Sequence, residues 1–166
     1  KIKEQEPGIW RRVVPSPMPD YIMHGKSIKA LVDRGTIVIA FGGGGIPVVY
    51  KEGHYSGVPA VIDKDRLSVL LAQNIQADAL IISTAVDAIR TGFGTPEEKS
   101  YSELSVDEAK TFLENGEFPV GSMGPKVESL IDAVVNIEEI KSVLCQPGDA
   151  IKALRGSSGT TISVSK

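Results

Sequence analysis

Hydrophobic residues follow two different periods along this chain, and segments of the two kinds alternate. Short runs of consecutive apolar residues, typical of strands buried on both faces, occupy residues 36–41, 79–84 and 140–145. Spacings of three and four predict amphipathic helices over residues 27–34, 65–74, 105–114 and 125–135, and a short helix over 148–154 precedes a last strand over 159–164. This alternation predicts an α/β fold, a three-layer α/β/α sandwich around a mostly parallel central sheet.

Local sequence signals mark where several of these elements begin and end. Ser105 followed by Glu108 forms a capping box, which predicts a helix start at this point. Pro125 suits the first position of its helix, because a missing N–H costs nothing there. Residues 48–50 and 55–58 flank a glycine-containing turn, so we expect a hairpin with an exposed His54 at its tip.

The first twenty residues differ from the rest in composition. They are polar and then rich in proline, which predicts an extended lead-in without a helix, whereas residues 21–166 form the lobe proper. Trp10, Arg11 and Arg12 either anchor this arm to the body or to a missing segment, or the two arginines are ordinary surface charges. The chain does not begin with Met, so we expect it to be a fragment of a longer protein.

Composition excludes several classes of function. The 166 residues carry a net charge of −3, with 23% charged residues, and this balance does not indicate a nucleic-acid partner. No apolar run reaches the ~18 residues of a membrane span, and the N-terminus lacks the apolar core of a signal peptide. The lone Cys145 lies in an apolar run, which predicts a buried structural thiol, no disulfide framework and a reducing, cytoplasmic setting.

Two lysines stand where helices are expected to begin. Lys64 lies between Asp63 and Asp65 at the start of one helix, and Lys126 follows Pro125 at the start of another. A helix N-terminus carries a partial positive charge, so a cation there costs roughly 0.3–1 kcal/mol unless an anion offsets it. Both positions therefore suit a phosphate group, since helix N-termini are ready anion sites. The alternative is that both lysines are solvated surface residues.

Two loops follow predicted strands. Four glycines at 42–45 come directly after the first strand and permit a ligand to approach the backbone closely, and the alternative is a flexible turn without a ligand. This loop fits neither the dinucleotide fingerprint nor the Walker A pattern, and the ligand-binding interpretation is nevertheless preferred to the flexible turn. Residues 85–89 follow the second strand, at the carboxyl end where open α/β sheets bind ligands.

Four segments together resemble the C-terminal half of carbamate kinase, a member of the amino-acid kinase superfamily. They read RRVVPSP at 11–17, GGGGIP at 42–47, AVIDKD at 60–65 and GSMGPKV at 121–127, and they occur in the same order as in that family. The last two are specific to carbamate kinases, and the resemblance spans nearly the whole chain. It implies reversible phosphoryl transfer between ATP with carbamate and ADP with carbamoyl phosphate, with Mg²⁺ and in a homodimer.

The resemblance also implies roles for particular residues. Lys64 and Lys126 would contact the transferring phosphoryl group and the ATP phosphates, and Asp65 would hold the two lysines in place. No residue is assigned as a direct metal ligand. The ATP or ADP molecule would lie against Gly43, Gly44, Ser83, Thr84, Ala85, Val86, Asp87, Phe93, Met123 and Gly124.

The sequence departs from the family in two respects. Carbamate kinases read Thr-Asp-Val-Asp where this chain has Thr84, Ala85, Val86 and Asp87, so one acid of the expected nucleotide pocket is absent, and Asp87 alternatively only caps the next turn. The glycine loops and the further lysine of the family's N-terminal half are also missing. The chain is therefore interpreted either as the nucleotide-binding half of an enzyme, inactive alone, or as a non-catalytic nucleotide-binding or assembly domain.

Overall fold

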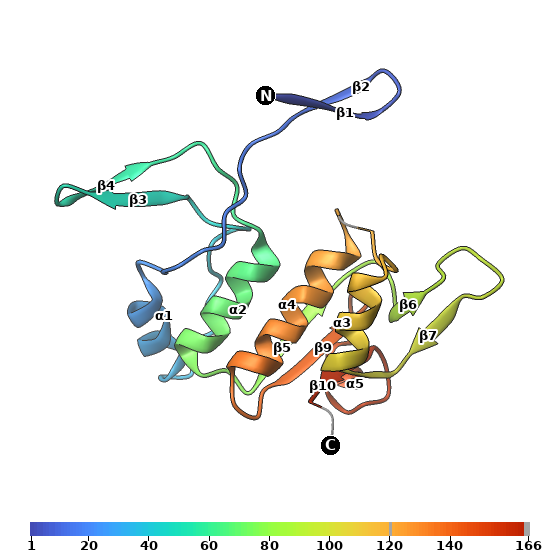
Figure 1. Cartoon of the computed structure of the whole chain (residues 1–166). Coiled ribbons are helices and arrows are strands. Elements are labelled where there is room, and N and C mark those ends of the chain that lie inside the picture. Colours follow the sequence, from blue (N-terminus) through green and yellow to red (C-terminus); the bar gives the residue numbers. More distant parts are fainter. Residues whose placement is uncertain (120, 165–166) are drawn as a thin grey trace.

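The computed structural model describes residues 1–119 and 121–164, and its central feature is a four-stranded mixed sheet (Figure 1). The strands are β5 (Ala79–Ser83), β9 (Lys141–Cys145), β10 (Thr160–Ser163) and β8 (Glu103–Ser105), in this spatial order. β5 pairs with β9 in parallel and β10 pairs with β8 in parallel, whereas β9 and β10 are antiparallel. The sheet is thus mixed and mostly parallel, which confirms the predicted α/β class.

Side chains alternate between the two faces of this sheet, as the strand period of two requires. Leu80, Ile82 and Leu144 join the main core, to which helices α2 (Lys64–Ile75), α3 (Val106–Glu114) and α4 (Met123–Asn136) contribute. Val143 and Cys145 point to the other face, where they pack with Ala153 of the short helix α5 (Ala150–Leu154). The layers are therefore unequal, with a large helical layer on one face and one short helix on the other, and Cys145 is the buried thiol that was predicted.

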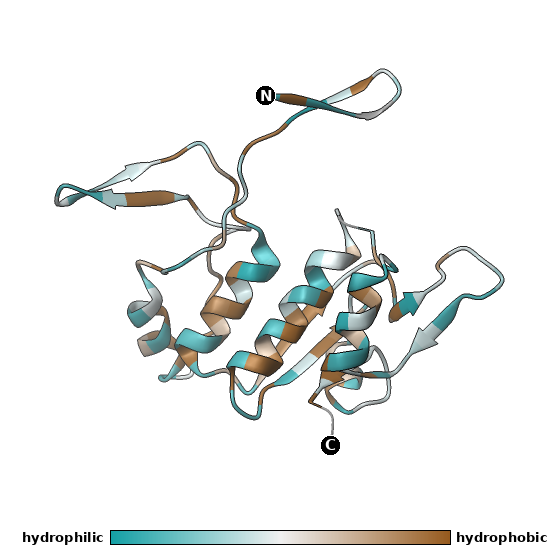
Figure 2. Ribbon diagram, in the orientation of Figure 1, coloured by the Kyte–Doolittle hydropathy of each residue, from teal (hydrophilic) through white to brown (hydrophobic). Residues whose placement is uncertain are grey.

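Helices form where the apolar spacing predicts them, and their inner faces are the hydrophobic ones (Figure 2). Their bounds are α1 (Gly25–Val32), α2 (Lys64–Ile75), α3 (Val106–Glu114), α4 (Met123–Asn136) and α5 (Ala150–Leu154). The capping box at α3 is confirmed, because the Glu108 backbone N–H donates to Ser105 Oγ and the Ser105 N–H donates to the Glu108 carboxylate. Val135 lies on the exposed side of α4.

The start of α4 was predicted two residues too late. Ser122 is the N-cap residue, so Pro125 occupies the third helical position and not the first. The structure permits this because the first four N–H groups of a helix have no intrahelical partner, and a missing N–H is harmless anywhere among them. The Gly124 N–H instead donates to the Pro119 carbonyl, 3.1 Å away, which ties the helix start to the preceding turn.

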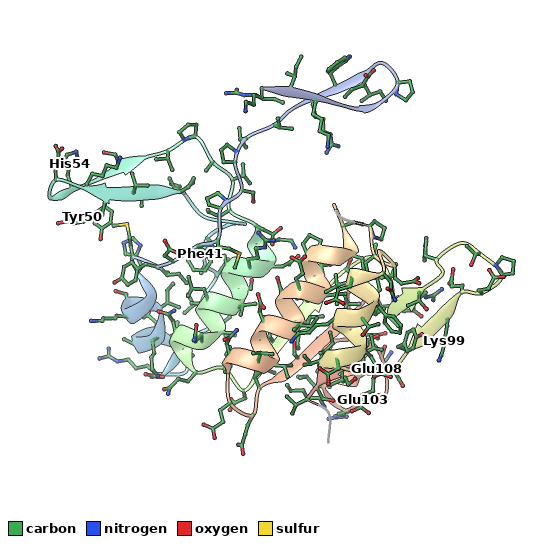
Figure 3. All side chains as sticks on the ribbon, in the orientation of Figure 1. Phe41, Tyr50, His54, Lys99, Glu103 and Glu108 are labelled. Atoms are coloured by element: carbon green, nitrogen blue, oxygen red, sulfur yellow. The ribbon has the colours of Figure 1, made fainter. Side chains whose placement is uncertain are left out.

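Three hairpins extend from the layered body (Figure 1). They are β1–β2 (Ile2–Glu6 and Ile9–Arg12), β3–β4 (Val48–Lys51 and His54–Gly57) and β6–β7 (Ile89–Thr91 and Lys99–Tyr101). The β3–β4 hairpin was predicted, with Tyr50 and His54 exposed on the projecting ribbon (Figure 3). The β1–β2 hairpin was not, although the absence of a helix in residues 1–20 is confirmed.

The expected buried strand over residues 36–41 is wrong. These residues contain no strand, and the side chains of Ile37 and Ile39 are 94% and 95% exposed. An apolar run indicates a buried strand only when a neighbouring strand and a covering layer are present, and sequence period alone cannot supply either.

Candidate functional site

The N-terminus of α2 is built by a carboxylate cap. Asp63 has extended backbone angles, and its Oδ1 accepts hydrogen bonds from the backbone N–H groups of Asp65 and Arg66, at 2.9 and 3.1 Å. This is the standard arrangement in which a side-chain oxygen satisfies free N–H groups of the first turn. It makes Lys64 the first residue of the helix and Asp65 the second, so both side chains emerge at the positive end of α2.

Asp65 holds two lysines with its two carboxylate oxygens. Lys64 Nζ donates to Oδ1 at 2.5 Å, and Lys126 Nζ donates to Oδ2 at 2.8 Å, although Lys126 lies 61 residues away in the sequence. The Asp65 side chain is only 8% exposed, whereas that of Lys126 is 17% and that of Lys64 is 56% exposed. The predicted grouping of these three side chains is therefore present, with the acid buried between the lysines.

Asp65 and Lys64 stabilise each other's ionised forms, and Lys126 also favours the ionised form of Asp65. Burial by itself would raise the pKa of Asp65, but the hydrogen bonds from Lys126 and Lys64 outweigh it and lower this pKa. Burial would likewise lower the pKa of Lys64, yet its hydrogen bond to Asp65 and the charge of Asp65 raise it. One hydrogen bond to Asp65 leaves two N–H donors on each ammonium group, so both lysines retain donors for an anionic ligand.

A second contact joins the same two helices one or two residues further along each helix. Arg66 Nη2 donates to Glu128 Oε2 at 3.1 Å, from α2 to α4. This pair was not predicted from the sequence, because two charged residues 62 positions apart carry no local signal that they meet. Together with Lys126 and Asp65, it braces the starts of α2 and α4 against each other.

The glycine loop packs against the residue that precedes the α2 cap. A Cβ atom on Gly44 would lie 1.8 Å from the Ile62 carbonyl oxygen, so only glycine fits at this position. Gly43 has φ of 137°, a conformation that other residues rarely adopt. The structure thus places Gly43 and Gly44 beside the start of α2, and it gives Gly44 a packing role that the sequence does not reveal.

The predicted nucleotide residues after β5 lie at the carboxyl end of the sheet. The Thr84 N–H donates to the Cys145 carbonyl at 2.9 Å, so the ends of β5 and β9 are joined, while Ser83 and Ala85 are exposed. Helix α2 leads into β5 and is antiparallel to it, and α4 leads into β9 in the same way. The carboxyl end of the sheet is therefore also the end where both helices begin (Figure 1). Val86 packs against the main core.

The remaining predicted residues flank this region in different ways. Asp87 forms an ion pair with Arg90, 2.7 Å apart, and the hydrogen bond from Arg90 lowers the pKa of Asp87. Phe93 is exposed in the turn between β6 and β7, a turn whose Gly92 N–H donates to Glu117. Met123 and Gly124 form the first turn of α4. Within residues 1–119 and 121–164, no side-chain hydrogen bond or ion pair links this group to the Lys64–Asp65–Lys126 cluster.

The donor set suits an anion and not a bare metal ion. Within residues 1–119 and 121–164, no three His, Cys, Asp or Glu side chains gather in a way that would hold a metal. Asp65 uses both oxygens on lysines, and Asp63 uses Oδ1 to cap the start of α2. Two ammonium groups at two helix N-termini instead match the oxygens of a phosphate chain, so a divalent cation would arrive coordinated mainly by those phosphates.

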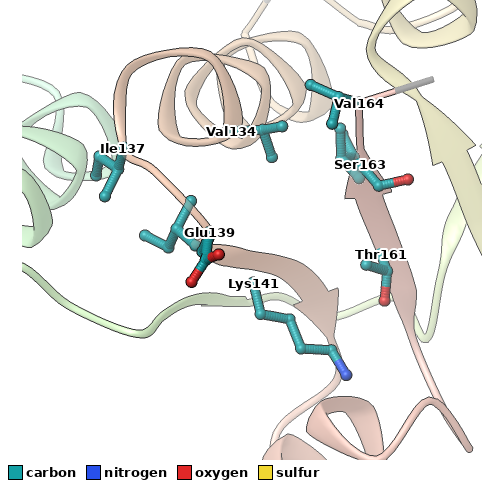
Figure 4. Close-up of a pocket in the computed structure, with 9 residues that line it drawn as sticks. Val134, Ile137, Glu139, Lys141, Thr161, Ser163 and Val164 are labelled. Atoms are coloured by element: carbon teal, nitrogen blue, oxygen red, sulfur yellow. The ribbon is translucent and has the colours of Figure 1, made fainter. Parts of the chain in front are cut away.

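A hollow elsewhere in the fold is separate from this cluster. It has a volume of about 280 Å³ and lies at the far end of α4, between that helix, β9 and β10 (Figure 4). Val134 and Ile137 form its apolar wall, and Glu139, Lys141 and Thr161 lie at its rim. Since the cluster lies where α4 begins and the hollow where α4 ends, the two do not form one site.

Comparison with known proteins identifies relatives of the chain. The model of the amino acid kinase family matches residues 4–145. The carbamate kinase of Staphylococcus haemolyticus is 46% identical over 153 residues, which cover 92% of this chain and 50% of that protein, and the carbamate kinase of Clostridium perfringens is 45% identical over 161 residues, 97% of this chain and 51% of that protein. The structure of a carbamate kinase from Giardia lamblia bound to AMP-PNP superposes with a TM-score of 0.92 at 36% identity, over 99% of this chain and 52% of that one.

The chain therefore spans about half the length of the curated relatives it matches. No helix in the described ranges combines the length and hydrophobicity needed to cross a bilayer. The family match covers most of the chain, and the relatives at 41–46% identity that we compared are all named carbamate kinases, which confirms the resemblance inferred from the sequence motifs. On this evidence, the chain belongs to the amino acid kinase family.

Proposed function

We propose that this chain is the nucleotide-binding half of a carbamate kinase-like phosphotransferase. The complete enzyme would transfer a phosphoryl group reversibly between ATP with carbamate and ADP with carbamoyl phosphate. Similarity to carbamate kinases over 92% or more of the chain supports the reaction class. AMP-PNP, an ATP analogue, is bound in the similar Giardia lamblia enzyme, which supports ATP and ADP as the nucleotides. We further propose that the protein acts in the cytoplasm as a homodimer.

The observation that carries the proposal is the buried Asp65 between Lys64 and Lys126. Phosphoryl transfer requires mainly that the reactants are positioned and that charge on the phosphoryl oxygens is neutralised. Two ammonium groups would repel each other, and the carboxylate between them fixes their separation. In this proposal Lys64 and Lys126 donate to phosphate oxygens. Asp65 keeps the two lysines at positions from which both can neutralise the charge on the oxygens of the transferring phosphoryl group.

The other site residues would hold the rest of the nucleotide. We assign Gly43, Gly44, Met123, Gly124, Ser83, Thr84, Ala85, Val86, Asp87 and Phe93 to this role. The first four border the starts of α2 and α4, beside the lysine cluster. The carboxyl-end loop after β5 is the place where α/β sheets bind ligands. Mg²⁺, which neutralises phosphate charge in such reactions, would be held chiefly by the nucleotide itself.

Calorimetric titration with ADP and with ATP, each with Mg²⁺, tests the binding half of the proposal. We expect the 166-residue chain to bind both nucleotides. Lys64→Met and Lys126→Met should each weaken binding by about 10- to 100-fold, because each removes a charge-assisted hydrogen bond. Lys26→Met is the matched control, since Lys26 is an exposed lysine in the first turn of α1. Equal losses in all three variants, or no nucleotide binding by the wild type, would contradict the assignment.

A coupled assay for ATP formation from ADP and carbamoyl phosphate tests the catalytic part of the proposal. We expect no turnover by this chain alone, because the segments that serve the carbamate side in the resembling enzymes are absent from its sequence. Turnover by the isolated chain would show that a single lobe suffices and would refute the division of roles.

A non-catalytic nucleotide-binding or assembly domain is the second candidate. It is favoured by Ala85, which stands where carbamate kinases carry an acid, and which is exposed at the end of β5. The coupled assay for ATP formation distinguishes the two candidate functions when the chain is combined with a lobe that binds the carbamate substrate. Binding without turnover in that combination would favour this second candidate.

A further inference from the structure

The β6–β7 hairpin has a base tied to the sheet and a tip that lies beyond its strand pairing. Three residue pairs join its strands, and a two-stranded ribbon of this length is only marginally stable in water. At the base, the Ile89 N–H donates to Thr160 Oγ1 of β10 at 2.8 Å. The turn between the strands, which carries Phe93, projects from the body (Figure 1), so other contacts must hold it.

Arg90 supplies such a contact from β6. Its Nη1 donates to Glu98 Oε1 at 2.5 Å and its Nη2 donates to Asp87 Oδ1 at 2.7 Å, so one guanidinium group joins the turn to the loop that follows β5. Glu98 Oε2 accepts from the Gly94 N–H at 2.8 Å, and this hydrogen bond, together with the one from Arg90, lowers the pKa of Glu98. The side chains of Arg90 and Glu98 are partly shielded, at 31% and 27% exposed.

A second contact fixes the same turn relative to α4. The Gly92 N–H donates to Glu117 Oε2 at 3.1 Å, and Glu117 lies in the segment between α3 and α4, the helix whose first turns carry Lys126. The turn is therefore held against both the loop after β5 and the approach to α4. Phe93 is 64% exposed on this turn, and an exposed aromatic ring is a surface on which a nucleobase can stack.

We propose that Arg90 is a positioning residue for the nucleotide: by binding Asp87 and Glu98 together, it holds the turn where Phe93 can meet the adenine base. The inference rests on the proposed function, in which the two-lysine cluster takes the phosphates, and it assigns the base end of the nucleotide to the β6–β7 turn. A turn that is ordered beforehand loses less conformational freedom when the ligand binds, so affinity is gained without a direct contact from Arg90.

Calorimetry with two probes, ADP and pyrophosphate, each with Mg²⁺, separates the base end from the phosphate end, because only ADP carries the base. We expect Arg90→Met to weaken ADP binding about 10-fold and to leave pyrophosphate binding unchanged. Arg90→Lys should weaken ADP binding nearly as much, since an ammonium group lacks the planar fork that reaches two carboxylates at fixed angles. Glu98→Gln should behave like Arg90→Met, and the double variant should lose little more, because both changes break one contact.

Arg155→Met is the matched control, because Arg155 is an exposed arginine at the C-cap of α5. Hydrogen exchange at the Gly94 amide should be faster in Arg90→Met without any ligand, whereas thermal unfolding should change little, because these ion pairs lie near the surface. Unchanged ADP binding in Arg90→Met, or equal losses of ADP and pyrophosphate affinity, would overturn this inference alone. Failure of the wild type to bind ADP would overturn the proposed function together with it.

Discussion

Replacement of Asp65 by Asn tests whether Asp65 holds Lys64 and Lys126 in place through its negative charge or serves only as a residue of the first turn of α2. The substitution keeps the size of the side chain and part of its hydrogen bonding, but it removes the negative charge between Lys64 and Lys126. The Lys126–Asp65 pair is well shielded, with side chains 17% and 8% exposed, whereas Lys64 reaches water. Breaking a fully buried ion pair costs about 3–5 kcal/mol, and breaking an exposed pair costs about 0–1 kcal/mol.

Because the Asp65 cluster lies between these limits, we expect its loss to lower the free energy of unfolding at pH 7 by about 2 kcal/mol. The pH dependence is a sharper signature. Despite its burial, the pKa of Asp65 is lowered by Lys126 and Lys64. Ionised Asp65 therefore contributes its full stabilisation above a pH of about 4, and the contribution is lost as the pH falls through the lowered pKa. The difference in free energy of unfolding between the wild type and Asp65→Asn should therefore shrink as the pH falls.

Urea unfolding at pH 7 and again near pH 3 measures both effects. Asp33→Asn is the matched control, because Asp33 also pairs with a lysine, Lys29, but its side chain is 56% exposed. This control should cost less than about 0.5 kcal/mol. If Asp65→Asn costs no more than the control, or costs the same at both pH values, the carboxylate does not hold the lysines through its charge. In the complete enzyme, the same change should lower turnover by about 10²–10³ and affect nucleotide affinity less.

Three further changes probe the surroundings of the site. Gly44→Ala should lower the free energy of unfolding by about 1–3 kcal/mol, because its Cβ would lie 1.8 Å from the Ile62 oxygen, while Gly57→Ala, with open space around it, should cost much less in the same urea titration. Ala85→Asp should strengthen Mg²⁺-ATP binding in calorimetry by restoring an acceptor at the rim of the proposed pocket, and unchanged or weaker binding would argue against that placement. Hydrogen bonds from Lys152, Gln146 and Ser158 lower the pKa of Asp149 to about 2, so Asp149→Asn should destabilise the fold above pH 4 and this penalty should fade as the pH approaches 2 in thermal unfolding.

Elements that depend on neighbouring residues in the chain were predicted well. The α3 capping box joins residues three positions apart, and the β3–β4 hairpin closes around a two-residue turn, so each is determined by local geometry. The lysines at the starts of two helices could also be recognised, because helix starts carry local signals and a cation there is unfavourable. The motif resemblance then added the acid between them.

What only the tertiary structure decided involves residues far apart in the chain. Asp65 and Lys126 meet because α2 and α4 pack side by side on one face of the sheet, and no local pattern reports which helices become neighbours. The close approach of Gly44 to Ile62 was hidden for the same reason. Residues 36–41 show the converse. Their apolar pattern predicted a buried strand, but no strand forms and Ile37 and Ile39 are exposed, because burial depends on a partner strand and the amino-acid sequence of the segment does not contain that information.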